Sequence, residues 1–126
     1  MTTLKRASWK RIPKATEYAL QGFKALYQRE AAFRQETWLL LVTTPLLIVF
    51  PSPAWLSALV LFSSGLILIA EAFNSALEAF IDHVAPEQHP EAGYVKDIGS
   101  AAVLMTFVLW GGTWGTLLLY LYHRIN

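Results

Sequence analysis

Carboxylate and amide side chains gather on one face of a predicted helix that continues directly from an apolar run. At about 100° per residue, five polar side chains fall within an arc of roughly 100°. This acidic stripe consists of Glu71, Asn74, Ser75, Glu78 and Asp82. Three carboxylates on one face repel one another unless cations neutralise them. Ionisable groups near membrane depth usually face a protein interior, a partner charge or a water-filled site. The stripe therefore predicts a bound metal ion or several basic partners.

Oxygen-only ligands favour Mg²⁺, which typically takes one or two protein carboxylates and completes its shell with water and substrate phosphates. A structural role is the alternative: Asn74, Ser75 and nearby alanines would form a polar seam that packs protomers together. A third possibility is a non-enzymatic scaffold or a proton-conducting subunit, in which Glu71, Glu78 and Asp82 form a relay. The stripe alone leaves these alternatives open.

Two shorter clusters lie outside the acidic stripe. Glu30 and Arg34 are spaced i, i+4, which predicts a helix salt bridge worth about a few tenths of a kcal/mol. Lys96 and Asp97 precede the last apolar run. There Asp97 is placed to cap the helix, and Lys96 is placed either to reach the membrane interface or to hold phosphate oxygens at a helix N-terminus.

The sequence lacks the motifs of soluble nucleotide-binding and metal-binding proteins. Neither Gly22 nor the glycines of 111–115 are followed by the Gly-Lys-Ser/Thr of a P-loop, and the protein-kinase signatures are absent. The three histidines, His83, His89 and His123, have no metal-ligand spacing, so we expect structural or surface roles for them. The absence of cysteine excludes disulfides and thiolate metal sites.

The composition places these groups in a membrane protein. The chain is 55% hydrophobic and 15% charged, with a mean hydropathy of +0.39, whereas soluble proteins carry roughly 25% charged residues. We expect one all-α domain over residues 1–126, with three transmembrane helices and an N-terminal amphipathic surface helix. The expected elements are the surface helix at about 4–29 and the transmembrane helices at about 30–50, 54–83 and 97–122.

Prolines and basic residues set the expected topology. Pro51 and Pro53 break the chain between the first two spans into an antiparallel hairpin, and Pro45 is expected to kink the first span. Eight of the ten Lys and Arg residues precede residue 37, so we expect a cytoplasmic N-terminus, a cytoplasmic 83–96 loop and a periplasmic C-terminus. No cleavable signal peptide and no nucleic-acid partner are expected.

Three strings in order resemble the bacterial integral-membrane diacylglycerol kinase family, which includes undecaprenol kinases. They are EAAFRQE at 30–36, EAFNSALEAFID at 71–82 and KDIGSAAV at 96–103. The resemblance covers essentially the whole chain and implies a homotrimer in the bacterial inner membrane that uses Mg²⁺ and ATP. The implied activity is phosphorylation of the diacylglycerol hydroxyl to give phosphatidic acid. Gln35 and Glu36 look like the diacylglycerol-using members, and undecaprenol is the alternative substrate.

The resemblance also implies roles for individual residues. Glu71 looks like the general base for the lipid hydroxyl, and Glu30 and Glu78 look like the carboxylates that hold the metal. The positions similar to nucleotide contacts are Arg11, Tyr18, Glu30, Glu78, Glu87, Gln88, His89, Lys96 and Asp97. The positions similar to lipid contacts and to the lining of the reaction centre are Arg11, Ala32, Phe33, Arg34, Gln35, Glu36, Glu71, Asn74 and Ser100. A kinase needs Glu30 and Lys96 near the acidic stripe, whereas a seam or relay has no use for them.

Overall fold

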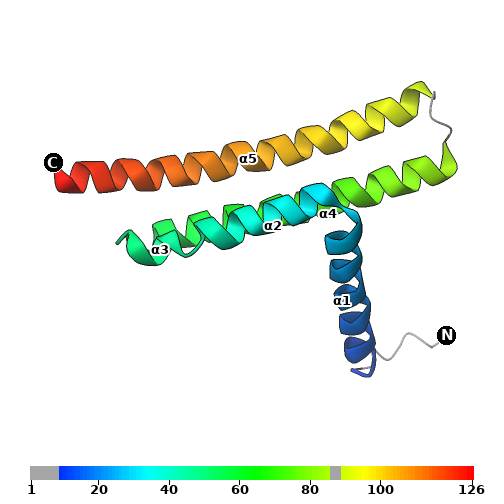
Figure 1. Cartoon of the computed structure of the whole chain (residues 1–126), viewed down its shortest axis with the longest axis horizontal. Coiled ribbons are helices and arrows are strands. Elements are labelled where there is room, and N and C mark those ends of the chain that lie inside the picture. The colour runs from blue at the N-terminus through cyan, green and yellow to red at the C-terminus, as the bar shows by residue number, and fades with distance from the viewer. Residues whose placement is uncertain (1–8, 86–88) are drawn as a thin grey trace, which may run out of the picture.

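The computed structural model describes residues 9–85 and 89–126, and all its regular elements within that part of the chain are helices (Figure 1). The predicted all-α class is confirmed. The helices are α1 (Arg11–Arg29), α2 (Ala31–Thr43), α3 (Leu46–Val49), α4 (Ala54–Val84) and α5 (Pro90–Ile125). Two residues of the implied nucleotide set, Glu87 and Gln88, lie outside the described residues, as does the 4–8 segment of the expected surface helix.

The two longest helices, α4 and α5, run antiparallel and side by side (Figure 1). Both are apolar and longer than the roughly 20 residues that cross the hydrocarbon core of a bilayer. Leu56, Val60 and Leu117 form their buried apolar contact near the start of α4. Further along, Ser63 Oγ lies 2.9 Å from Thr113 Oγ1. These contacts hold α4 and α5 in one register.

The expected first span is not one continuous helix. α2 ends at Thr43 and α3 begins at Leu46, so the expected first span, at about 30–50, is interrupted near Pro45. Pro45 has no N–H to donate and its ring clashes with the preceding turn. The amides of Leu47 and Ile48 instead bond to the carbonyls three residues earlier, each at 3.0 Å, which tightens the helix locally into a 3₁₀ turn. The interruption falls at Pro45, where the sequence predicts a kink.

The last helix begins at Pro90, well before the predicted start near residue 97. Proline suits the first helical position because its missing N–H would be unpaired there. His89 caps the helix, since its Nδ1 accepts the amide hydrogen of Glu91 at 3.1 Å. Lys96 and Asp97 consequently lie inside α5 and not at its N-terminus. The expectations that Asp97 caps this helix and that the loop extends from 83 to 96 are wrong.

The first helix leaves the α4–α5 pair steeply and extends away from it (Figure 1). Glu30, with φ −108° and ψ 108°, adopts an extended conformation that separates α1 from α2. The Arg34 guanidinium donates to the carbonyls of Tyr27 at 2.7 Å and Gln28 at 3.1 Å, where a cation is favoured at the helix C-terminus. The ion pair found among the described residues joins Lys96 and Asp82. The expected Glu30–Arg34 salt bridge is therefore not formed.

Candidate active site

The acidic stripe lies on the continuous helix α4 and runs from the interior of the molecule to its surface. Glu71, Asn74 and Ser75 are buried, with 6%, 8% and 5% of their surface exposed. Glu78 is half-buried, and the side chain of Asp82 is 63% exposed. The stripe therefore connects a buried carboxylate to a position that water can reach.

A second buried carboxyl group faces the deepest residue of the stripe. Glu36, on α2, has 8% of its surface exposed, and its carboxyl lies close enough to the Glu71 carboxyl for the two to interact. Glu36 Oε2 has no hydrogen-bond partner within residues 9–85 and 89–126. Two facing carboxylates that both carry charge repel one another, so this contact calls for a proton or a cation between them. The resemblance implied only lipid contact for Glu36. The sequence did offer a signal for a further role, because a carboxylate next to an apolar segment usually faces a functional site.

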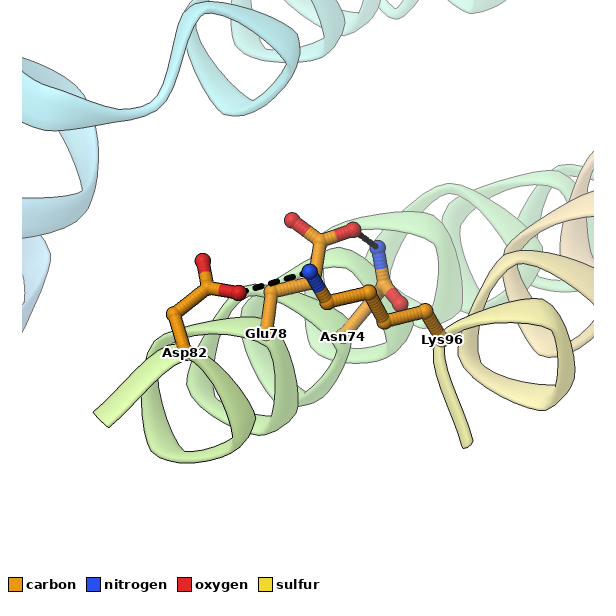
Figure 2. Close-up of polar contacts among 4 residues, drawn as sticks. All are labelled: Asn74, Glu78, Asp82 and Lys96. Carbon is orange, nitrogen blue, oxygen red and sulfur yellow. Dashed lines mark hydrogen bonds and ion pairs between the residues drawn. The ribbon is translucent and has the colours of Figure 1, made fainter. Parts of the chain in front are cut away.

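Two further carboxylates lie near this pair. Those of Glu30 and Glu78 both act electrostatically on Glu71. Asn74 Nδ2 donates to Glu78 Oε1 at 3.2 Å and so orients that carboxylate (Figure 2). Four carboxylates thus gather from the α1–α2 junction, α2 and α4.

The donor chemistry of this cluster fits Mg²⁺, which binds through one or two carboxylates and obtains its other ligands from water and phosphates. Within the described part of the chain, no three acidic or histidine side chains converge closely enough to hold a metal ion by themselves. The cluster therefore suits a metal that arrives with a phosphate-bearing substrate better than a closed structural site.

The Lys96 side chain crosses from α5 to the exposed end of the acidic stripe (Figure 2). Its Nζ donates to Asp82 Oδ1 at 2.6 Å. Glu30 and Lys96 are thus both associated with α4, one near Glu71 and the other at Asp82. Their placement favours a kinase site over a seam or a relay.

The other residues that the resemblance implied for the site differ in burial and in distance from the acidic stripe. Phe33 is buried, whereas Ala32, Gln35, Asp97 and Ser100 are exposed. Arg11 and Tyr18 lie on the exposed N-terminal half of α1, which extends away from α4 (Figure 1). They share one face of that helix around a shallow hollow of about 370 Å³. Within one chain the structure does not bring them to the stripe.

A groove of about 260 Å³ lies between α1 and α4, beside the carboxylate cluster. Small and apolar side chains make up most of its walls, with Glu30 and Ser75 among the lining residues. The lining consists of Gly22, Ala25, Leu26, Arg29, Glu30, Ala72, Ser75, Ala76 and Ala79. Such a surface can accept the apolar part of a lipid next to the acidic groups.

Gly99 sets the distance between α4 and α5 beside the stripe. A Cβ at this position would collide with the side chain of Asn74. An added Cβ would therefore displace the side chain that orients Glu78, or push α5 away from α4. Sequence reasoning selected the neighbouring Ser100 and missed this contact, because the residue that faces α4 depends on the rotation of α5.

We expect Gly99→Ala to displace Asn74, to lower activity and to cost about 1–3 kcal/mol of stability, the usual range for overpacking. The measurements are the thermal midpoint of the detergent-solubilised protein and its phosphotransfer rate. Gly93→Ala is the matched control in the same helix, because a Cβ there meets nothing within 4 Å. Equal effects of the two substitutions would contradict the proposed contact.

The chain is similar to known diacylglycerol kinases over most of its length. The family model described as prokaryotic diacylglycerol kinase matches residues 17–118. A diacylglycerol kinase of Pseudomonas aeruginosa is 42% identical over 110 residues, which cover 87% of this chain and 89% of that protein. One from Escherichia coli K12 is 39% identical over 108 residues, covering 86% and 88%. One from Haemophilus influenzae is 36% identical over 107 residues, covering 84% and 90%.

The two apolar helices and these matches define a membrane-associated lipid kinase. The chain belongs to the prokaryotic diacylglycerol kinase family. The family resemblance found in the sequence is confirmed.

Proposed function

We propose that this protein transfers the γ-phosphoryl group of ATP to the hydroxyl of diacylglycerol, with Mg²⁺, to give phosphatidic acid and ADP. The observation that carries the proposal is that Glu30, Glu36 and Glu78, from three segments, all lie near enough to the buried Glu71 to act on it electrostatically, beside an apolar groove. A packing seam would not require carboxylates from the α1–α2 junction and α2. The relatives named diacylglycerol kinase support the choice of lipid.

Glu71 is the proposed general base. The lipid hydroxyl oxygen attacks the γ-phosphorus, its proton passes to the Glu71 carboxylate, and the bond to the ADP oxygen breaks. Glu71 is the most buried carboxylate of the stripe, at the depth where a lipid hydroxyl would lie. Phosphoryl transfer needs mainly positioning and neutralisation of spread negative charge, so no covalent intermediate on the protein is required.

Glu30 and Glu78 are the proposed metal-holding residues, and Asn74 keeps the Glu78 carboxylate oriented. When bound, Mg²⁺ neutralises charge on the transferring phosphoryl group. Lys96 supplies a second positive charge at the exposed end of the stripe, where a nucleotide arrives from water. Asp97, His89, Glu87 and Gln88 are proposed nucleotide contacts from the start of α5 and the preceding segment.

We also propose that α2 and α3 together form a third membrane crossing beside α4 and α5. The basic and aromatic α1, which has no buried residue, then lies at the cytoplasmic surface, and the C-terminus is periplasmic. Only 6% of the most apolar stretch of α5 is buried inside the chain, against 33% of the corresponding stretch of α4. This exposed apolar surface supports a homotrimer in the bacterial inner membrane, in which α5 faces lipid or neighbouring protomers.

The groove between α1 and α4 is the proposed site of the lipid, with Ala32, Phe33, Arg34 and Gln35 as proposed contacts from α2 and Ser100 from α5. Arg11 and Tyr18 remain proposed contacts of the nucleotide. Arg11 is additionally a proposed contact of the lipid headgroup.

The test is an assay of the purified chain in mixed micelles with labelled ATP and either diacylglycerol or undecaprenol, with and without Mg²⁺. We expect labelled phosphatidic acid from diacylglycerol only when Mg²⁺ is present. Preferential labelling of undecaprenol would replace the lipid in this proposal. The absence of transfer to both lipids would overturn the kinase assignment.

A further inference from the structure

One ion pair within residues 9–85 and 89–126 links the end of α4 to the start of α5. Lys96 Nζ donates to Asp82 Oδ1 at 2.6 Å, and the two side chains are 40% and 63% exposed (Figure 2). The proposed reaction gives Lys96 a role at the nucleotide but gives none to Asp82. Asp82 nevertheless lies on the same face of α4 as Glu78, one turn further toward water.

The backbones that carry this ion pair are held in a defined register. Gly99, one turn after Lys96 in α5, lies against the Asn74 side chain of α4. Asn74 in turn donates to Glu78. Because both helices are fixed at this contact, the Cα of Lys96 has a set position relative to the stripe. The ammonium group does not, because the lysine side chain is long and flexible.

Asp82 is one of the groups that hold that ammonium in place. The acidic stripe becomes progressively more exposed from Glu71 to Asp82, so its Asp82 end is the side that an aqueous nucleotide approaches. An ammonium held there meets the phosphates before they reach the buried carboxylates. Lysine has three N–H donors, so contact with one carboxylate is compatible with contact to phosphate oxygens.

We propose that Asp82 is a positioning residue that holds the Lys96 ammonium where the phosphates of the incoming nucleotide bind. The inference rests on the proposed kinase function and adds Asp82 to it. The Asp82 carboxylate does not itself touch the nucleotide. Its loss removes this contact, broadens the range of positions of the Lys96 ammonium and weakens nucleotide binding, while the base Glu71 is unaffected.

The direction of this effect is diagnostic. We expect Asp82→Asn to weaken ATP binding about two- to fivefold, the range that coupling in an exposed ion pair supports, and to leave kcat at saturating ATP within about twofold. Simple removal of a negative charge would act in the opposite sense, because ATP is a polyanion and less repulsion would strengthen its binding. Weakened binding therefore reports the position of Lys96 and not the net charge.

The experiment is a double-mutant cycle on the full-length purified chain in detergent micelles. ATP binding is measured calorimetrically in EDTA, so that no metal contributes, and KM and kcat are measured in parallel with Mg²⁺. The variants are Asp82→Asn, Lys96→Gln and the combination of both, with Asp82→Glu as the conservative rescue. Glu91→Gln, an exposed acid in the first turn of α5, is the control for charge loss and should retain normal activity.

We expect the Asp82→Asn effect to disappear in the Lys96→Gln background, because Asp82 acts through Lys96, and we expect Asp82→Glu to bind ATP nearly as well as wild type. Unchanged or tighter ATP binding by Asp82→Asn would overturn the inference, as would an equal loss in both backgrounds. Failure of the proposed function is seen separately, as a wild-type chain that makes no phosphatidic acid. If the wild-type chain binds no ATP in EDTA, the same cycle is read from KM for ATP with Mg²⁺, and a KM of Asp82→Asn at or below the wild-type value overturns the inference.

Discussion

Replacement of Glu71 by Gln is expected to lower kcat by about 10²- to 10⁴-fold while KM for ATP stays nearly unchanged. The amide keeps the size of the side chain but cannot accept the proton of the lipid hydroxyl. Glu71 is buried on α4, and its carboxyl is the one around which Glu30, Glu36 and Glu78 gather. The measurement is steady-state kinetics with diacylglycerol in mixed micelles.

Oligomer size in detergent must be measured on the same preparation. A packing seam predicts loss of the assembly and lower thermal stability, whereas a general base predicts an intact assembly that turns over slowly. Glu17→Gln, on the exposed face of α1, makes the same chemical change outside the site and should leave kcat unaltered. If Glu71→Gln keeps near-normal kcat, or loses activity only as the assembly dissociates, the base must be sought at Asp82 or Asp97.

Glu78→Gln and Glu30→Gln should each raise the Mg²⁺ concentration needed for half-maximal activity and lower turnover at least about tenfold. Changes to the shell outside the direct metal ligands already cost about 10- to 100-fold, and these two carboxylates are the proposed ligands themselves. In Glu78→Gln the hydrogen bond from Asn74 loses its charged acceptor as well. The measurement is a Mg²⁺ titration of the initial rate at saturating ATP.

Glu91→Gln supplies the comparison for the metal titration, because it also removes an exposed carboxylate from a helix but lies outside the proposed site. Its Mg²⁺ requirement should match that of the wild type. A wild-type Mg²⁺ requirement in Glu30→Gln or Glu78→Gln would remove that residue from the metal site. Measuring the assembly in detergent again separates loss of metal from loss of structure.

Much of this protein can be predicted from its sequence because the main signals are local. The helix period places Glu71, Asn74 and Glu78 on one face whatever surrounds them. The lengths of the apolar stretches in α4 and α5 and the helix breaks at the prolines can also be read from local sequence. Ordered strings over 30–36, 71–82 and 96–103 were sufficient to indicate the family.

Tertiary structure decided which of these residues meet. The contact between Glu36 and Glu71 depends on how α2 packs against α4, and no spacing in the sequence encodes it.

The approach of Gly99 to Asn74 depends on how α5 is rotated about its axis. Successive residues of a helix differ by about 100° in direction, so the sequence does not show which of them faces α4. The i, i+4 spacing allowed Arg34 to pair with Glu30, but Glu30 adopts an extended conformation and Arg34 donates to the carbonyls of Tyr27 and Gln28 instead. The sequence did not predict the helix start at Pro90, because the polar residues 90–97 lack the apolar pattern of a span. The proline and its His89 cap nevertheless favour a helix there.

Residue types and helix period therefore determined the chemistry available to this chain. Packing between helices determined which groups act on one another, because those contacts join residues far apart in sequence.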